Sequence, residues 1–71
     1  MTKFIKESIA ELKFSLEFEQ NNRTETNYNG LAIATYKRRL ETALDAEFLL
    51  KEGEITENEA EAMVAEALST I

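Results

Sequence analysis

Residues 49–60 read Leu-Leu-Lys-Glu-Gly-Glu-Ile-Thr-Glu-Asn-Glu-Ala, and this stretch decides the fold of the C-terminal half. Gly53 follows a helical run, and glycine adopts the left-handed conformation that closes a helix at little steric cost. Thr56 and Glu59 then match a capping box: the Thr56 hydroxyl can accept from the Glu59 amide, and the Glu59 carboxylate from the Thr56 amide. A stop and a start so close together predict a helix–turn–helix hairpin.

The composition restricts the chemistry that the chain can perform. Its 71 residues make one domain and include no Cys and no His. The usual zinc sites, a thiol nucleophile and an imidazole base are therefore excluded. The two glycines, Gly30 and Gly53, are each explained by a turn, so there is no glycine-rich phosphate loop. We expect no catalytic residues, no bound metal and no cofactor, and hence a protein that is not an enzyme.

Charge is distributed unevenly along the chain, whose net charge is −6. Residues 1–40 carry seven Lys and Arg against five Glu, a net charge of +2. Residues 41–71 carry one Lys against nine Asp and Glu, a net charge of −8. Phosphate binding depends on Lys and Arg displacing counterions, so direct binding to nucleic acid is disfavoured. The acidic half suits a solvated helical surface, a basic protein partner or mimicry of nucleic acid.

The N-terminal segment, residues 3–20, carries an apolar stripe. Its members recur at intervals of three and four and are Ile5, Ile9, Leu12 and Leu16. This spacing predicts a helix whose stripe faces a core. Thr2 is placed to cap its N-terminus, and Glu, Lys, Leu and Ala in the segment favour helix. We expect the helix to end near residues 21–22, because Asn can close a helix.

Residues 12–36 also allow a second interpretation. Residues 12–19 alternate between apolar and polar side chains, as a half-buried strand does. Asn29-Gly30 lies between two further strand-like segments, and Asn-Gly is a strong hairpin signal. A β-meander at 12–36, within an α+β fold, is therefore the alternative to helix and loop. Ala32 and Ala34 are weak strand formers and speak against it.

Two further helices are predicted, one starting around residues 27–31 and ending at Glu52, the other running from Glu57 to about Thr70. The apolar face of the first of these comprises Ile33, Tyr36, Leu40, Ala43 and Leu44. That of the second comprises Ala60, Met63, Val64, Ala67, Leu68 and Ile71. The preferred fold is thus a single all-α domain, residues 1–71, with three helices and a capped C-terminal hairpin.

Four phenylalanines are the candidate interaction residues. Phe4, Phe14 and Phe18 fall on the side of the first helix opposite its apolar stripe. Phe48 belongs to a helix end that is apolar almost all round, which either the third helix or another chain would bury. Exposed apolar patches of this kind mark contact surfaces. The competing interpretation is that Phe14 and Phe18 are interior residues, packed by a loop or by neighbouring strands.

One basic cluster, Lys37-Arg38-Arg39, is a secondary candidate for contact with phosphate or with an acidic partner. Successive positions on a helix point about 100° apart, so these three side chains do not form one patch by themselves.

The hairpin region, residues 46–69, resembles the short C-terminal helical hairpins of the SHOCT type. The residues that carry the resemblance are Leu49, Leu50, Gly53, Ile55, Thr56, Glu59 and Leu68. SHOCT modules are small bacterial segments with a Leu-rich helix, a Gly-x-Ile-Thr turn and an acidic helix. Ala60 stands where an aromatic residue is usual in that family. In size and character the whole chain also resembles small accessory proteins of phages and mobile elements.

These features lead us to expect a small, acidic, helical regulator, inhibitor or adaptor that binds another protein. Its partner is a foreign protein or, in a homo-oligomer, a second copy of the chain. The absence of Cys fits a reducing cytoplasm, and no apolar run approaches the ~20 residues that cross a membrane. The alternative functions are a structural subunit of a larger assembly and an acidic mimic of nucleic acid that blocks a DNA- or RNA-binding enzyme.

Overall fold

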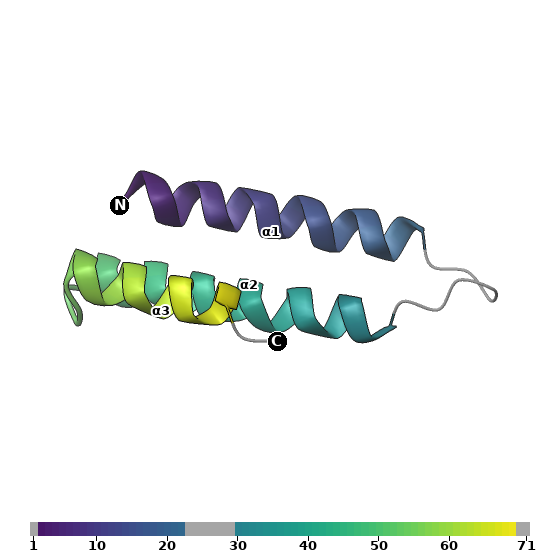
Figure 1. Cartoon of the computed structure of the whole chain (residues 1–71). Coiled ribbons are helices and arrows are strands. Elements are labelled where there is room, and N and C mark those ends of the chain that lie inside the picture. Colours follow the sequence, from purple (N-terminus) through teal and green to yellow (C-terminus); the bar gives the residue numbers. More distant parts are fainter. Residues whose placement is uncertain (1, 23–29, 70–71) are drawn as a thin grey trace.

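The computed structural model describes residues 2–22 and 30–69, of which 89% are helical. The helices within these ranges are α1 (Lys3–Asn21), α2 (Gly30–Lys51) and α3 (Glu57–Ser69). Each helix runs antiparallel to the one before it, and the molecule is elongated, measuring 45 × 19 × 16 Å along its principal axes (Figure 1). The predicted all-α domain of three helices is confirmed.

α1 begins directly after Thr2, the residue predicted to cap it. The Thr2 hydroxyl accepts a hydrogen bond from the Ile5 amide at 3.1 Å, which satisfies one of the free amides of the first turn. Ile5, Ile9 and Leu12 are buried in the core, and Leu16 is half-buried. The stripe read from the sequence is therefore the face that α1 turns towards the other helices.

The C-terminal end of α1 is closed by Asn22. Its side-chain Nδ2 donates to the Phe18 carbonyl at 2.7 Å, and its backbone amide donates to the same carbonyl at 3.1 Å. The helix thus ends where we expected it, and Asn22 closes it with φ −100°, outside the left-handed region. The side chain satisfies a terminal carbonyl directly, and the left-handed turn is not needed.

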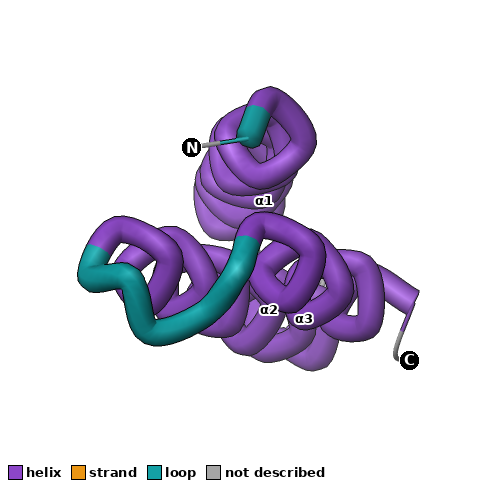
Figure 2. The backbone as a smooth tube through the Cα atoms, turned by 90° about the vertical axis from the view of Figure 1, so that its left-hand side faces the viewer, coloured by secondary structure: helices purple, strands orange, loops and turns teal. Residues whose placement is uncertain are grey.

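α2 is the helix against which the other two pack. α1 and α3 each lie along α2, whereas α1 and α3 contact one another less extensively. Viewed end-on, α1 lies over the pair formed by α2 and α3 (Figure 2). Ala43 and Ala46 of α2 and Ala60 of α3 are fully buried in the core that α1 also lines. Because their side chains end at Cβ, the helix backbones can approach closely.

The end of α2 forms a Schellman motif around Gly53. The Gly53 amide donates to the Leu50 carbonyl at 3.1 Å, and the Glu54 amide donates to the Leu49 carbonyl at 2.9 Å. Gly53 has φ +76°, the one positive φ among the described residues. The predicted glycine stop is therefore confirmed, and its hydrogen bonds satisfy carbonyls that the helix leaves free.

The start of α3 forms the predicted capping box. The Glu59 amide donates to the Thr56 Oγ1 at 3.2 Å, and the Thr56 amide donates to the Glu59 Oε1 at 2.9 Å. Ile55, just before the cap, packs against the core cluster that includes Ala60. The two caps and this apolar contact turn the chain back, so that α3 returns along α2.

α3 is too short to cover the full length of α2. It has 13 residues against 22, which at 1.5 Å per residue correspond to about 20 Å and about 33 Å. In Figure 1, α3 lies beside the part of α2 that leads into the turn and stops before the other end. Residues 14–21 of α1 and 30–37 of α2 therefore pair without a third described helix beside them; we call them the two-helix segment.

The alternative fold, a β-meander at 12–36, is wrong for every described part of that range. Residues 12–21 belong to α1 and residues 30–36 to α2, while 23–29 lie outside the described residues. The alternation at 12–19 arises because Leu12 and Leu16 face the core while Phe14 and Phe18 face outwards. A helix can also produce this alternation, since two steps of 100° turn a side chain to nearly the opposite side. It places residues 12 and 16 on one side and residues 14 and 18 on the other.

Two members of the predicted apolar faces lie at the surface. Leu44 of α2 and Leu68 of α3 are about one-third exposed, at 37% and 36%. On α2, the buried positions Ala43 and Ala46 point between α1 and α3, and Leu44 is turned about 100° away from Ala43. Ile71, also predicted on the face of the third helix, lies outside the described residues.

Substitutions in the hairpin test how much the turn stabilises the fold. Thr56→Ala removes one partner of the capping box and should lower the free energy of unfolding by about 1 kcal/mol. Gly53→Val should cost about 1–2 kcal/mol, because a β-branched residue is strained at φ +76°. No atom lies within 4 Å of a Cβ added at Gly53, so this cost comes from the backbone. Gly53→Asn is the control with the smaller expected loss. A denaturation midpoint that neither Thr56→Ala nor Gly53→Val changes would contradict the role of the turn.

A substitution in the stripe of α1 tests whether α1 is part of the same core. Ile5 is fully buried, so Ile5→Ala should lower the free energy of unfolding by about 2–5 kcal/mol. A domain of this size is stabilised by only about 4–11 kcal/mol, so the variant should be partly unfolded or close to it. Urea unfolding followed by circular dichroism measures the change. Phe14→Ala on the outer side of α1 is the control and should alter stability by less than about 0.5 kcal/mol.

Candidate protein-interaction surface

Phe14 and Phe18 lie on the outer side of α1, away from the core. Their side chains are 71% and 55% exposed. They are four residues apart, so they project from the same side of the helix, and Leu12 and Leu16 are turned roughly 200° from them. The competing interpretation does not hold as far as strand neighbours are concerned, because the described residues on both sides are helical. The loop that it also invoked, at 23–30, lies outside the described residues except for Gly30. The two phenylalanines form a pair of exposed rings on the two-helix segment, which we call the Phe14–Phe18 ridge.

A hollow lies on each side of the Phe14–Phe18 ridge. The first has a volume of about 200 Å³, and its lining comprises Phe14, Ser15, Phe18, Glu19 and Tyr36. The second has a volume of about 250 Å³, and its lining comprises Phe14, Glu17, Phe18 and Asn21. Because Ser15 and Glu19 lie on one flank of α1 and Glu17 and Asn21 on the other, the two rings separate the hollows. Each hollow thus combines aromatic walls with one carboxylate.

The surroundings of the ridge on α1 are charged. Glu7 and Glu11 precede Phe14 by seven and three residues, which places them on the same outer side, and both are exposed. Glu17 is exposed as well, and Glu19 is half-buried. Lys3 lies at the far end of this side, where its Nζ is 3.9 Å from the Glu7 Oε1. Lys13, which is also exposed, lies next to Phe14 and one helical turn from Glu17, so the rings are set in a surface that carries charges of both signs.

The structure does not bring the four candidate phenylalanines together. Phe4 is in the first turn of α1, and Phe48 is near the C-terminal end of α2, where they are 39% and 60% exposed. Ten residues of helix, about 15 Å, separate Phe4 from Phe14. Because α1 and α2 are antiparallel, Phe4 and Phe48 lie towards the hairpin end and the Phe14–Phe18 ridge towards the opposite end (Figure 1). They are two separate groups of exposed aromatic residues.

The basic cluster is divided, as predicted. Lys37 and Arg38 are exposed, whereas Arg39 is half-buried and its Nε is shielded from solvent. The stem of a partly buried arginine covers apolar surface and is not available as part of a flat basic patch. Lys37 and Arg38 alone are thus a smaller positive surface than the sequence suggests at first sight.

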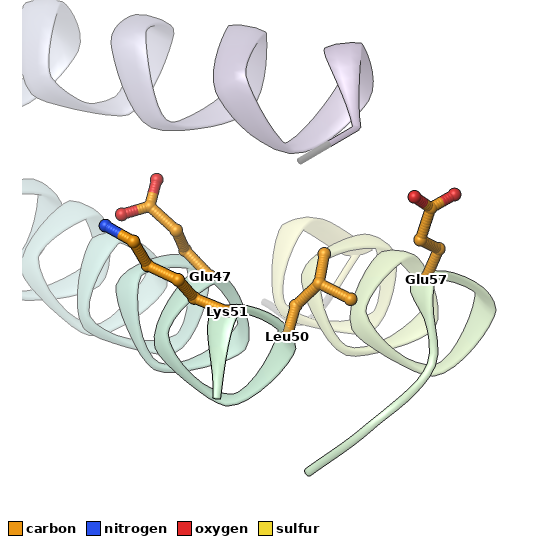
Figure 3. A pocket seen from close by; sticks show the side chains of 4 residues that line it. All are labelled: Glu47, Leu50, Lys51 and Glu57. Atoms are coloured by element: carbon orange, nitrogen blue, oxygen red, sulfur yellow. The ribbon is translucent and has the colours of Figure 1, made fainter. Parts of the chain in front are cut away.

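A further hollow is at the hairpin end, and the sequence did not indicate it. Its volume is about 370 Å³, and its lining comprises Glu47, Leu50, Lys51 and Glu57. Figure 3 shows Glu47 and Lys51 on the last turns of α2, Glu57 on the first turn of α3 and Leu50 between them. No pattern in the sequence joins residues 47 and 57, because the turn between two helices brings them together. Two carboxylates and one ammonium therefore surround a leucine in this charged hollow.

Neither a metal cluster nor a membrane span is found in the described part of the chain. Residues 2–22 and 30–69 contain no group of three or more Asp or Glu side chains arranged to hold a metal ion. None of the helices described is both long and apolar enough to cross a membrane. The candidate site consists of two rings, two hollows and their carboxylates.

The comparison with known proteins identifies no relative of this chain. The chain matches none of the family models, curated proteins or solved structures with which it was compared. The resemblance of residues 46–69 to SHOCT-type hairpins thus depends on the quoted residues alone.

Proposed function

We propose that this chain is a small protein-binding regulator, inhibitor or adaptor, and that the Phe14–Phe18 ridge is its contact surface. The observation that carries the proposal is the exposure of both rings, 71% and 55%, on one side of α1. Aromatic anchors commonly dominate the energy of an interface, at about 2 kcal/mol or more each when they become fully buried. A partner that covers the two rings therefore gains much of its affinity from them.

The rest of the chain supports this proposal because the fold does not need the rings. Ile5, Ile9 and Leu12 already supply the buried side of α1. Phe14 and Phe18 fall outside that core cluster, and more than half of each side chain is exposed to solvent. Large apolar side chains that cluster at the surface of a small protein are usually reserved for binding.

The test is a double substitution, Phe14→Ser with Phe18→Ser. Serine has a helix propensity close to that of phenylalanine, so the variant should keep its circular dichroism spectrum and its melting temperature. Immobilised wild-type protein should retain a partner from lysate of the native host, and the variant should lose it. Sedimentation of the purified proteins, measured in parallel, shows whether the partner is a second copy of the chain.

Phe48→Ser is the matched control. Phe48 is as exposed as the ridge phenylalanines but lies towards the other end of the molecule, so the control protein should retain the same partner. Loss of helix in the double variant would show that the rings stabilise the fold and would refute the proposal. Retention of every partner by a folded double variant would refute it as well.

A further inference from the structure

We propose that two copies of this chain form a dimer in which their α1 helices pack antiparallel through the Phe14–Phe18 ridge. The two-fold axis crosses α1 near residues 15–16, so that Lys13 of each copy faces Glu17 of the other. This inference rests on the proposed function, because it names the partner that covers the same ridge. Such a dimer is closed, since both copies contribute the same patch and leave no equivalent patch free.

The charges beside the ridge follow a pattern that suits a two-fold axis. Lys13 directly precedes the first ring, and Glu17 directly precedes the second. Both are exposed and one helical turn apart, so they lie on one flank of the ridge. An antiparallel second α1 presents the same flank in reverse order, so each Lys13 meets a Glu17. The patch is therefore complementary to itself in charge.

One axis aligns both the charges and the rings. The charged pair is centred on residue 15 and the pair of rings on residue 16. At a rise of 1.5 Å per residue, an axis between these positions aligns the two pairs to within about 1.5 Å. Within a single helix the charged pair has its less favourable order, with Lys before Glu. It therefore loses little when the two side chains turn towards a second copy.

The second hollow beside the ridge can take the Phe14 ring of the other copy. Its lining residues belong to the range 14–21 of α1 and are centred between residues 17 and 18. With the axis near residues 15–16, Phe14 of the other copy comes to this level along the helix. A cavity of about 150 Å³ takes up benzene, and this hollow measures about 250 Å³. The rings of both copies thus meet in one layer, where each has aromatic neighbours.

The net charge of −6 does not oppose this dimer, because it is confined to one end of the molecule. Residues 1–51 carry eight Lys and Arg against eight Asp and Glu, whereas residues 52–66 carry six Glu and neither Lys nor Arg. Those six belong to the hairpin turn and α3. α1 starts at the hairpin end (Figure 1), so an antiparallel pair directs the two hairpin ends away from one another. Charges more than about 8 Å apart are largely screened at physiological salt.

The size of the contact predicts a weak, reversible dimer. At 71% and 55% exposure, the two rings of each copy offer roughly 250 Å². The dimer therefore buries roughly 500 Å² of aromatic surface, against about 1,200 Å² in total for the smallest stable interfaces. The flanking charged residues add to this area without reaching the size of a permanent interface. We expect a dissociation constant on the order of 10 μM.

Charge reversal tests this arrangement directly. Sedimentation equilibrium of the full chain, from about 1 μM to about 1 mM, measures the dissociation constant of the dimer. Lys13→Glu or Glu17→Lys alone turns both attractions into repulsions, so each should weaken the dimer about tenfold or more. Mixing the two variants should restore a dimer, because the heterodimer pairs opposite charges at both positions. Phe14→Ser with Phe18→Ser should leave the chain monomeric over the same range.

Lys51→Glu is the matched control. It changes the net charge by the same amount as Lys13→Glu, and Lys51 is exposed at the hairpin end of α2, away from the other copy. The control should weaken the dimer less than about twofold, because exposed charges far apart are screened. Circular dichroism should show the same helical content for every charge variant, since all the substituted positions are exposed.

The outcomes distinguish failure of this inference from failure of the proposed function. A wild-type chain that stays monomeric at every concentration would overturn the inference, while a host protein retained through the ridge would leave the proposed function standing. Equal weakening by Lys13→Glu and Lys51→Glu would show a general effect of charge and overturn the antiparallel arrangement. So would the absence of a heterodimer after mixing. A dimer that persists without both rings would place the contact outside the ridge, which also overturns the inference.

Discussion

Close packing through small side chains is the constraint on which the rest of this structure depends. Ala43, Ala46 and Ala60 are fully buried, and beside them lie Ile5 and Val64, the largest fully buried side chains among the described residues. A chain of 71 residues buries only about 60% of the surface that it exposes when unfolded, so it has few core residues to use. Alanines let the helix backbones approach, and the larger side chains of α1 then fill the space above them.

The unequal lengths of the helices explain why the chain has a free surface at one end. α3 covers the part of α2 near the turn and stops before the two-helix segment (Figure 1). In that segment α1 and α2 pair without a third described helix beside them. Phe14 and Phe18 lie on that segment, and more than half of each side chain is exposed. The buried stripe and the exposed rings thus lie on different faces of one helix. Such a separation allows the outer side of α1 to carry rings and carboxylates without disturbing the core.

The sequence by itself determined the features that depend on neighbouring residues along the chain. The caps at Thr2, Gly53 and Thr56 follow from hydrogen bonds between residues three to five positions apart, and the apolar stripe of α1 follows from the 3.6-residue repeat. The outward position of Phe14 and Phe18 follows from the same repeat, once helix rather than strand is chosen for 12–21. That choice was correct because Glu, Lys, Leu and Ala favour helix more strongly than the short alternating pattern favours strand.

Only the tertiary structure decided which residues from different helices share a surface. Tyr36 of α2 completes a hollow beside Phe18 of α1, and Glu57 of α3 faces the same hollow as Glu47 of α2. Leu44 and Leu68 look like core positions on their own helices, yet they are partly exposed. The physical reason is that burial depends on the direction from which a neighbouring helix approaches and on how far that helix extends. Neither quantity is encoded in the repeat of a single helix. Only the packed structure could therefore show that the phenylalanines form two groups and that hollows lie beside the ridge.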